Sequence, residues 1–290
     1  MQKLLYLFIN LIIINLISGN ISSLEGKTNN LKRKESIFAK IIGGQPVPVE
    51  SYPFTVQLFN FGALCSGTII HSWTVLTSAH CMDLNQDTNE MRIQTGSRYV
   101  YDFDSTMYKV LSFVIHDNYN NEAQFSNDIA LIFVEKPIQL GIKTQKAVLV
   151  DNDKWMNHNE KEFIVTGWGW TQYGGPVSEL GLMMTHLNYV PRDECGKLHQ
   201  LKLTSDMFCL YGNGTRDTCK GDSGGGVIWN GMIVGITSHG DGCAKKGKPS
   251  IYTNVFLFRD WIREEIEKFL FKYCNQKEKQ SIRKNKLLIS

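Results

Sequence analysis

One serine and one histidine of this chain have neighbours that suit nucleophilic catalysis. Ser223 lies in the tract 221–225, Gly-Asp-Ser-Gly-Gly, and glycines let a backbone approach a substrate carbonyl closely and aim N–H groups at it. A serine hydroxyl is a weak nucleophile until a base removes its proton. His80, in the tract Thr-Ser-Ala-His-Cys at 77–81, is the candidate base because imidazole titrates near neutral pH.

Asp128 supplies the carboxylate that such a base needs. It precedes the apolar run Ile-Ala-Leu-Ile, where a buried carboxylate is costly unless it is paired. Beside His80 it would hold the required tautomer and stabilise the imidazolium. Each residue alone has an ordinary structural explanation, as a core histidine, a cap or turn aspartate, or a glycine loop. Together they predict a Ser-His-Asp site.

The elements that position these residues are short apolar runs separated by Gly, Asn and Asp. Such runs at close spacing predict an all-β sandwich or barrel rather than βαβ units, and their number fits two barrels joined near residues 145–160. A helical period appears only at the end, from Leu257 to a predicted end near Cys274. The clearest strand-like runs are Thr55–Phe59, Thr68–Ile70, Trp73–Thr77, Tyr108–Ile115, Ile129–Val134, Phe163–Thr166 and Met232–Thr237.

Residues 1–19 predict a secretory signal peptide. A short positive start at Lys3 precedes the apolar run Leu4–Ile17, and small and polar residues follow. The run is shorter than the roughly 18–20 residues that span a bilayer, so we expect a secreted, extracellular protein without a membrane span. Disulfides are permitted in that compartment.

Charge divides the chain into three parts. The whole chain has a net charge of +3, but residues 41–271 carry 19 basic and 25 acidic side chains. Such an acidic body offers no basic footprint for nucleic acid, so no nucleic-acid partner is expected. The positive excess falls in residues 20–40, which we expect to be an activation pro-segment, and in residues 275–290, which we expect to be a basic disordered tail.

With these motifs the chain resembles the trypsin-like (chymotrypsin-type) secreted serine proteases. The resemblance covers about Ile41 to Tyr273 and implies a peptidase domain over 41–274. Its fold would be all-β, two packed six-stranded antiparallel β-barrels with a C-terminal α-helix. The active site would lie in the cleft between the barrels.

The resemblance also implies a role for each catalytic residue. His80 would act as general base and then as general acid, Asp128 would orient it, and Ser223 would form an acyl-enzyme. The backbone N–H groups of Gly221 and Ser223 would form the oxyanion hole. No cofactor is implied.

Activation is implied by the tract Lys-Ile-Ile-Gly-Gly at 40–44. In this family, cleavage after a basic residue frees an Ile or Val amine that pairs with the aspartate before the catalytic serine. Here cleavage after Lys40, by another trypsin-like protease or by the enzyme itself, would pair Ile41 with Asp222, because a buried carboxylate needs a cation. The alternative is a solvated Ile-Ile-Gly-Gly turn.

Substrate preference is implied by Asp217, six residues before Ser223, at the position that forms the floor of the primary specificity pocket. A carboxylate there prefers polypeptide substrates with Lys or Arg at P1, the residue before the cleaved bond. The alternative is a solvated surface aspartate. Other partners implied by the family are protein inhibitors. The walls of the pocket would come from Ser238, His239, Gly240 and Ser250. Two of these residues depart from the family pattern: His239 stands where Trp is usual, and Ser250 stands where Gly is common. Ser238 should also help orient the catalytic aspartate.

Seven cysteines leave one over if three bridges form. The resemblance implies Cys65–Cys81, Cys195–Cys209 and Cys219–Cys243, and leaves Cys274 free or paired between chains. A further family bridge is missing, because Phe163 and Trp229 occupy its positions. We expect these two rings to pack against each other as an apolar substitute; the alternative is two unrelated core residues.

Two local patterns concern modification and metal. Asn213 begins the sequon Asn-Gly-Thr and is a candidate glycosylation site. The stretch matching the family's calcium loop offers only Asp102 and Asp104, and no cysteines have zinc-site spacing, so no metal is expected.

Two rival classes of function were weighed against a secreted serine endopeptidase. A non-catalytic protease homologue acting as a binding or adaptor protein typically lacks a triad member, and all three are present. An α/β-hydrolase esterase also uses Gly-x-Ser-x-Gly, but its chain order is Ser, Asp, His. The order found here, His80, Asp128, Ser223, favours the endopeptidase.

Overall fold

The computed structural model describes residues 41–83, 85–102, 105–156 and 162–289, with side chains as far as Asn275. The expected signal peptide (1–19) and pro-segment (20–40) lie outside these residues. None of the described helices combines the length and the apolar composition needed to cross a membrane.

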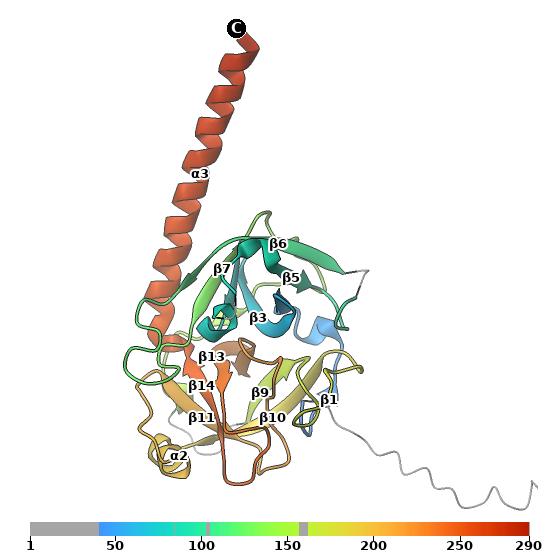
Figure 1. Cartoon of the computed structure of the whole chain (residues 1–290), viewed down its shortest axis with the longest axis vertical. Coiled ribbons are helices and arrows are strands. Elements are labelled where there is room, and N and C mark those ends of the chain that lie inside the picture. The colour runs from blue at the N-terminus through green and yellow to red at the C-terminus, as the bar shows by residue number, and fades with distance from the viewer. Residues whose placement is uncertain (1–40, 84, 103–104, 157–161, 290) are drawn as a thin grey trace, which may run out of the picture. The chain divides into compact units, whose positions relative to one another are not determined.

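Six antiparallel strands of the N-terminal half close into the first barrel (Figure 1). The apolar runs expected as strands before residue 135 all fall in it. Around the barrel, each strand pairs with its neighbours in the order β2-β3-β4-β7-β6-β5. These strands are β2 (Thr55–Asn60), β3 (Ala63–His71), β4 (Thr74–Thr77), β5 (Met91–Thr95), β6 (Thr106–Ile115) and β7 (Ala130–Val134).

The second barrel is a ring of six antiparallel strands in the C-terminal half, in the order β9-β10-β11-β14-β13-β12 and back to β9. Two short strands join the same sheet from outside the ring: β1 (Gln45–Pro46) pairs with β10, and β8 (Val148–Leu149) pairs with β13. The ring strands are β9 (Glu162–Gly167), β10 (Met183–Val190), β11 (Met207–Tyr211), β12 (Gly226–Trp229), β13 (Met232–His239) and β14 (Ser250–Asn254). The prediction of two six-stranded antiparallel barrels is confirmed.

The two barrels share a buried apolar layer. Leu131 and Phe133 of β7 pack in one cluster with Ile228 of β12 and with Ile233 and Ile236 of β13. Each barrel has a further core of its own. Because burial of each such side chain contributes roughly 1.5–3 kcal/mol, this shared layer fixes one barrel against the other and thereby fixes the loops that meet between them.

The C-terminal helix α3 (Arg259–Ile289) begins against this shared layer. Phe269 stacks on Phe133 with ring centroids 4.2 Å apart, and Ile262 is buried in the same cluster. The helix was expected to end near Cys274, with a disordered tail over 275–290; instead it continues to Ile289. Residues 275–289 contain no Gly or Pro and are rich in Gln, Lys and Leu, which favour helix, so nothing in their composition stops it.

The remaining helical elements are short. One α-helix, α2, packs beside β11 and contributes the buried Cys195. Of the five 3₁₀ turns in the described part of the chain, four lie between strands and one leads into α3; η3, one of the four, contains His80. These elements are α2 (Arg192–His199), η2 (Val49–Ser51), η3 (Ala79–Met82), η4 (Thr88–Glu90), η5 (Lys154–Met156) and η6 (Val255–Phe258).

The three disulfides pair as the resemblance implied, Cys65–Cys81, Cys195–Cys209 and Cys219–Cys243. Cys274 is a free, exposed thiol. At the position of the missing family bridge, the buried ring of Phe163 contacts Trp155, Phe208 and Tyr189. Trp229 is only partly buried at the edge of the same cluster. A cluster of rings thus fills this region, with Trp229 packed against the cluster that contains Phe163; direct packing of these two rings stays a prediction.

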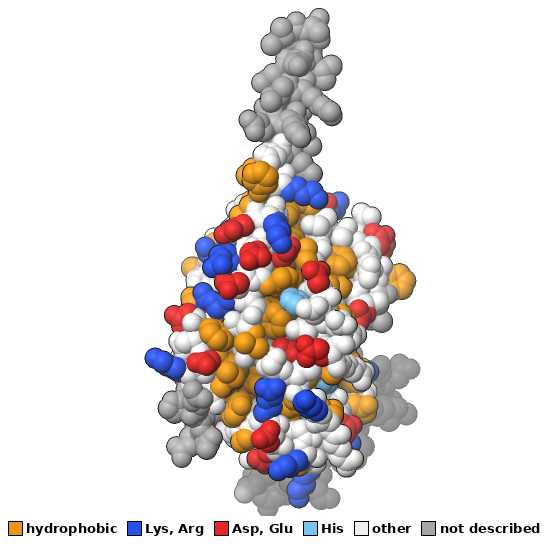
Figure 2. Space-filling model, turned by 90° about the vertical axis from the view of Figure 1, so that its left-hand side faces the viewer, with side chains coloured by type: hydrophobic (Ala, Val, Ile, Leu, Met, Phe, Trp, Pro, Cys, Tyr) orange, Lys and Arg blue, Asp and Glu red, His pale blue; other side chains and the backbone are white. Residues whose placement is uncertain are grey.

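Charges of both signs are mixed on the described surface. On the face in Figure 2, Lys and Arg side chains alternate with Asp and Glu side chains rather than gathering in one basic area. Exposed ion pairs such as these contribute about 0–1 kcal/mol each, so the core and the disulfides carry the stability. Examples are Lys143–Glu50, Lys245–Asp241, Arg263–Asp260 and Lys268–Glu265.

Candidate active site

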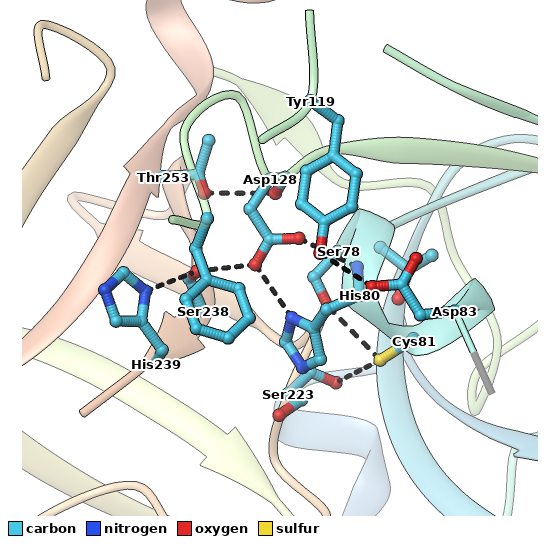
Figure 3. Close-up of polar contacts among 12 residues, drawn as sticks. Ser78, His80, Cys81, Asp83, Tyr119, Asp128, Ser223, Ser238, His239 and Thr253 are labelled. Carbon is cyan, nitrogen blue, oxygen red and sulfur yellow. Dashed lines mark hydrogen bonds and ion pairs between the residues drawn. The ribbon is translucent and has the colours of Figure 1, made fainter. Parts of the chain in front are cut away.

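The three residues predicted to form the triad meet between the barrels, each at the end of a strand (Figure 3). His80 lies in η3, directly after β4, and Asp128 lies just before β7. Ser223 lies in the turn that precedes β12. β4 and β7 are neighbours in the first barrel, so their ends bring His80 and Asp128 together. Ser223 comes from the second barrel.

Asp128 is fully buried and binds His80 twice. Its Oδ1 accepts the backbone N–H of His80 at 2.9 Å, and its Oδ2 lies 2.8 Å from Nδ1 of the ring. The hydroxyl of Ser238 donates to the same Oδ2 at 2.5 Å. The Thr253 hydroxyl donates to the Asp128 carbonyl at 3.0 Å. Side chain and backbone of the aspartate are therefore both fixed.

This arrangement separates the pKa values of the pair. Burial alone would raise the pKa of Asp128, but the attraction of His80 and the hydrogen bonds from His80 and Ser238 outweigh it and lower that pKa. Burial alone would lower the pKa of His80, but the charge and hydrogen bond of Asp128, with a smaller contribution from Asp83, raise it. A carboxylate that stays ionised beside an imidazole of raised pKa favours proton acceptance by His80.

The turn containing Ser223 is held by the first barrel. Ser66 of β3 donates its N–H to the Ser223 carbonyl at 2.7 Å and its hydroxyl to the Gly221 carbonyl at 3.0 Å. Gly221 has a φ of +101°, and a Cβ there would lie 2.8 Å from the backbone of Gly169, so only glycine fits. Within the described part of the chain, the amides of Gly221 and Ser223 donate to no acceptor, which leaves both for a ligand oxygen.

Ser223 lies on the side of the His80 ring away from Asp128 (Figure 3). Among the hydrogen bonds of the described residues, none joins the Ser223 hydroxyl to His80. Such contacts are often long without substrate and tighten when it binds.

A cavity of about 440 Å³ opens beside Ser223. The residues expected as pocket walls all line this cavity, as does Ser223. These walls are Ser238, His239, Gly240 and Ser250.

Asp217 is 4 % exposed and adjoins this cavity through Thr218 and Ser250, which line it. Its Oδ1 accepts from the Thr218 amide at 2.9 Å and from the Ser250 hydroxyl at 2.7 Å, and its Oδ2 accepts from the Ala244 amide at 2.7 Å. Burial raises its pKa to about 6 despite these three donors. The alternative of a solvated surface aspartate is therefore excluded.

Asp222 is a second buried carboxylate without a cation. It is 0 % exposed and accepts the amides of Gly169 at 2.8 Å and Cys219 at 2.9 Å. Burial and, to a smaller extent, the negative charge of Asp217 raise its pKa to about 7 against the two amide donors. No described cationic side chain forms an ion pair with it.

The segment expected to supply that cation enters the same region. Ile41 is fully buried and has a φ of +46°. Ile42 pairs with Asp217 through an isolated bridge, in which the Asp217 amide donates to the Ile42 carbonyl at 3.0 Å. Lys40, the expected cleavage site, lies outside the described residues. A solvated turn at 41–44 does not agree with the burial of Ile41.

Sequence comparison with known proteins shows the family of this chain. The trypsin family model matches residues 41–262. The chain belongs to the trypsin family. It is 34% identical over 233 residues to a trypsin of Phaedon cochleariae, covering 79% of this chain and 89% of that protein. It is 31% identical to trypsin epsilon of Drosophila erecta (77% of this chain, 86% of that protein) and to cationic trypsin-3 of Rattus norvegicus (78% and 90%). This trypsin-family chain is accordingly a serine protease, a hydrolase of polypeptides.

Sequence reasoning missed two residues at the site of this trypsin-family protein. The ring of Phe125 meets His80 edge-on with centroids 5.7 Å apart and stacks on His239 at 4.5 Å. The ammonium of Lys220 lies 5.1 Å from the centre of the Trp170 ring, and Lys220 lines the cavity. The available signals were an aromatic residue in a polar loop shortly before the triad aspartate and a lysine close to the nucleophile.

The structure also describes most of the residues considered for metal binding and glycosylation. Among the described residues, one group has metal-ligand spacing: Cys65, His80 and Cys81. Its two cysteines form a disulfide and have no thiolate to offer a metal. Asp102 accepts a hydrogen bond from the Ser97 hydroxyl at 2.9 Å, and Asp104 lies outside the described residues. Asn213 is exposed in a turn.

Proposed function

We propose that this trypsin-family protein is a secreted serine endopeptidase, made as a zymogen, that hydrolyses peptide bonds after Lys or Arg. The observation that carries the proposal is the buried Asp217, whose hydrogen-bond donors Thr218 and Ser250 line the same cavity as Ser223. An unpaired carboxylate of raised pKa gains most from a ligand that brings a positive charge.

The catalytic sequence assigns each proton. His80 takes the proton of the Ser223 hydroxyl as the oxygen attacks the carbonyl carbon, and the amides of Gly221 and Ser223 bind the resulting oxyanion. The imidazolium, stabilised by Asp128, then gives its proton to the departing amine and leaves an acyl-enzyme. Water, deprotonated by His80, attacks the ester in the same way and releases Ser223.

Selection for a cation follows from the way Asp217 is bound. A neutral side chain in the cavity would leave a buried carboxylate without a counter-charge, whereas the ammonium of Lys or the guanidinium of Arg would supply it. The similar proteins named above are called trypsins, which supports the same preference.

The donors to Asp217 also favour Lys over Arg. Thr218 and Ser250 both donate to Oδ1, while Oδ2 receives only the Ala244 amide. A guanidinium binds a carboxylate best through both oxygens at once, whereas an ammonium needs one. With Oδ1 occupied, Oδ2 suits the point charge of a lysine.

Activation is proposed to follow cleavage after Lys40 by another trypsin-like protease or by the enzyme itself. The new amine of Ile41 would then pair with Asp222, which in the uncut chain is buried with two amide donors and a pKa raised to about 7. Since Asp222 directly precedes Ser223, the pairing would act on the turn that contains the nucleophile and its oxyanion donors.

Secretion is supported by the signal-like leader at residues 1–19 and by three disulfides, which persist in oxidising compartments. In that setting, protein inhibitors that enter the cavity are expected partners. The exposed Asn213 would carry a glycan.

The test is digestion of a peptide library by the secreted protein after cleavage at Lys40, beside a Ser223→Ala control treated identically. We expect cleavage after Lys and Arg, and a loss of about 10⁶-fold in the control. Equal activity in both samples would contradict the catalytic assignment. Cleavage after aromatic residues by the wild type alone would contradict only the role of Asp217.

A further inference from the structure

A second imidazole approaches the triad from the side opposite His80. Nδ1 of His239 lies 3.0 Å from the Ser238 hydroxyl, which itself donates to Asp128 Oδ2 at 2.5 Å. Figure 3 shows the row of His239, Ser238, Asp128 and His80, with the other nitrogen of His239 pointing away from Ser238.

The direction of each hydrogen bond in this row follows from the groups themselves. An ionised carboxylate only accepts, so the single proton of the Ser238 hydroxyl is committed to Asp128. The contact between that hydroxyl oxygen and His239 then needs a proton on Nδ1 of His239. All donors therefore point toward the carboxylate, from His239 through Ser238 on one side and from His80 on the other.

His239 is held in the neutral state in this place. Burial, with the nearby imidazoles of His80 and His199, lowers its pKa to about 4 against the opposing attraction of Asp128. A neutral imidazole carries one proton, so His239, which lines the cavity, donates through Nδ1 and keeps Nε2 as an acceptor. The stacked ring of Phe125, 4.5 Å away, fixes the plane of the imidazole.

We propose that His239 is a positioning residue of the catalytic centre, which donates from Nδ1 to Ser238 and thereby orients and polarises the hydroxyl that binds Asp128. The inference rests on the proposed function in that it takes Asp128 and His80 as the working pair. Donors in series strengthen one another, so the bond from His239 makes Ser238 a better donor. Part of the negative charge of Asp128 is thereby balanced by Ser238, and His80 keeps the tautomer that accepts the serine proton.

Two substitutions separate the hydrogen bond from the ring. His239→Phe keeps an aromatic face for Phe125 and removes the donor. His239→Asn removes the ring and can place its amide N–H where Nδ1 lies. Loss of a neutral hydrogen bond corresponds to about 3- to 10-fold, so we expect that decrease in reactivity for His239→Phe and recovery of most of it for His239→Asn.

Reactivity is measured on the cleaved enzyme as the rate of inactivation by a small phosphonofluoridate, which modifies the nucleophilic serine without occupying the specificity pocket. The second readout is the pKa of His80 by NMR. The charged groups facing His80 are Asp128 and Asp83. With less of the Asp128 charge balanced by Ser238, we expect the His80 pKa to rise in His239→Phe and to stay near the wild-type value in His239→Asn.

The third readout is the tautomer of His239, taken from the ¹⁵N shifts of its two ring nitrogens in the wild-type protein near neutral pH. A proton on Nδ1 supports the proposal. A proton on Nε2 overturns it, because Nδ1 would then compete with Asp128 for the Ser238 proton. Equal inactivation rates and equal His80 pKa values in His239→Phe and wild type also overturn it. Failure of the proposed function has a different signature: the wild type itself would not react with the phosphonofluoridate, whereas the tautomer is measured without any reaction.

Discussion

The fully buried Asp222 gives the uncut chain a pH-dependent stability that activation should abolish. The folded uncut chain offers this carboxyl two amide donors and no described cation. Replacing it by asparagine removes the titration while leaving a side chain of nearly the same shape. Asparagine can accept only one of the two amides through its oxygen, which adds a constant, pH-independent cost.

The magnitude follows from the raised pKa. The carboxyl titrates at its ordinary value of 3.8 when unfolded and at about 7 in the folded uncut chain. Between these pH values the folded state holds a proton that the unfolded state has lost, so stability falls as pH rises through this window. Each pKa unit is worth 1.36 kcal/mol, so the fall amounts to about 4 kcal/mol between pH 4 and pH 8.

The assay is urea unfolding of the uncut chain at several pH values, with Ser223→Ala in every sample to prevent self-cleavage. The free energy of unfolding of the wild-type Asp222 protein is compared with that of Asp222→Asn. Asp217, with its own pKa raised to about 6, titrates in both samples, so its contribution largely cancels in the difference. We expect the free energy of unfolding of the Asp222 protein, relative to that of Asp222→Asn, to fall by about 4 kcal/mol as pH rises through the window.

Parallel curves for the two proteins would refute the reasoning, since they would mean that Asp222 titrates alike in the folded and unfolded states. The same measurement after cleavage at Lys40 separates the two halves of the argument. If the Ile41 amine pairs with Asp222, the ion pair lowers the pKa of the carboxyl, and the fall between pH 4 and pH 8 disappears. A fall that persists in the cleaved protein would contradict the pairing.

Three other outcomes are expected. The Ile41 amine of the cleaved enzyme should have a raised pKa, so its ion pair should still be intact at about pH 8, and activity should be lost on the alkaline side as pH rises through the raised value; a pH–rate profile with the same alkaline limb in Asp222→Asn would contradict this. Ser250→Gly removes one of the two donors to Oδ1 of Asp217 and so opens a site on that oxygen for a bidentate guanidinium; kcat/KM for Arg relative to Lys substrates should then rise about 10-fold, and an unchanged ratio would show that Ser250 does not set the preference. Phe163→Ala should lower the free energy of unfolding by about 3–5 kcal/mol in urea, whereas a loss below 1 kcal/mol would mean that the surrounding rings refill the space.

The triad was within reach of the sequence because its residues lie in short local patterns, and the pocket residues were within reach through the family resemblance. Asp128 is followed by β7 and His80 is preceded by β4, so the apolar runs that predicted the strands also placed the catalytic side chains at strand ends. Ser223 has glycines close on both sides, and the close approach of Gly221 to Gly169 explains one of them. Period and local spacing thus placed the three triad residues, whereas the other site residues came from the resemblance.

Contacts between segments far apart in the sequence were out of reach. The pairing of β1 with β10 and the stacking of Phe125 on His239 depend on how the barrels bring distant segments together. The rings of Trp155, Phe208 and Tyr189 around Phe163 were also out of reach, because spacing does not limit which distant rings pack on a buried one. The end of α3 was misjudged because a charged surface helix and a charged tail have the same composition.

The site contains three buried aspartates. Their pKa values distinguish the aspartate that has a cationic partner in this structure from the two that have none among the described residues. Asp128 has His80 beside it, and its pKa is lowered. Asp217 and Asp222 have only neutral donors, and their pKa values are raised to about 6 and about 7. In the proposed function, each missing cation arrives with an event: the Ile41 amine with activation, and a Lys or Arg side chain with substrate. The buried charge that is costly before each event becomes a favourable pair after it, which couples activation and substrate choice to the same residues that surround Ser223.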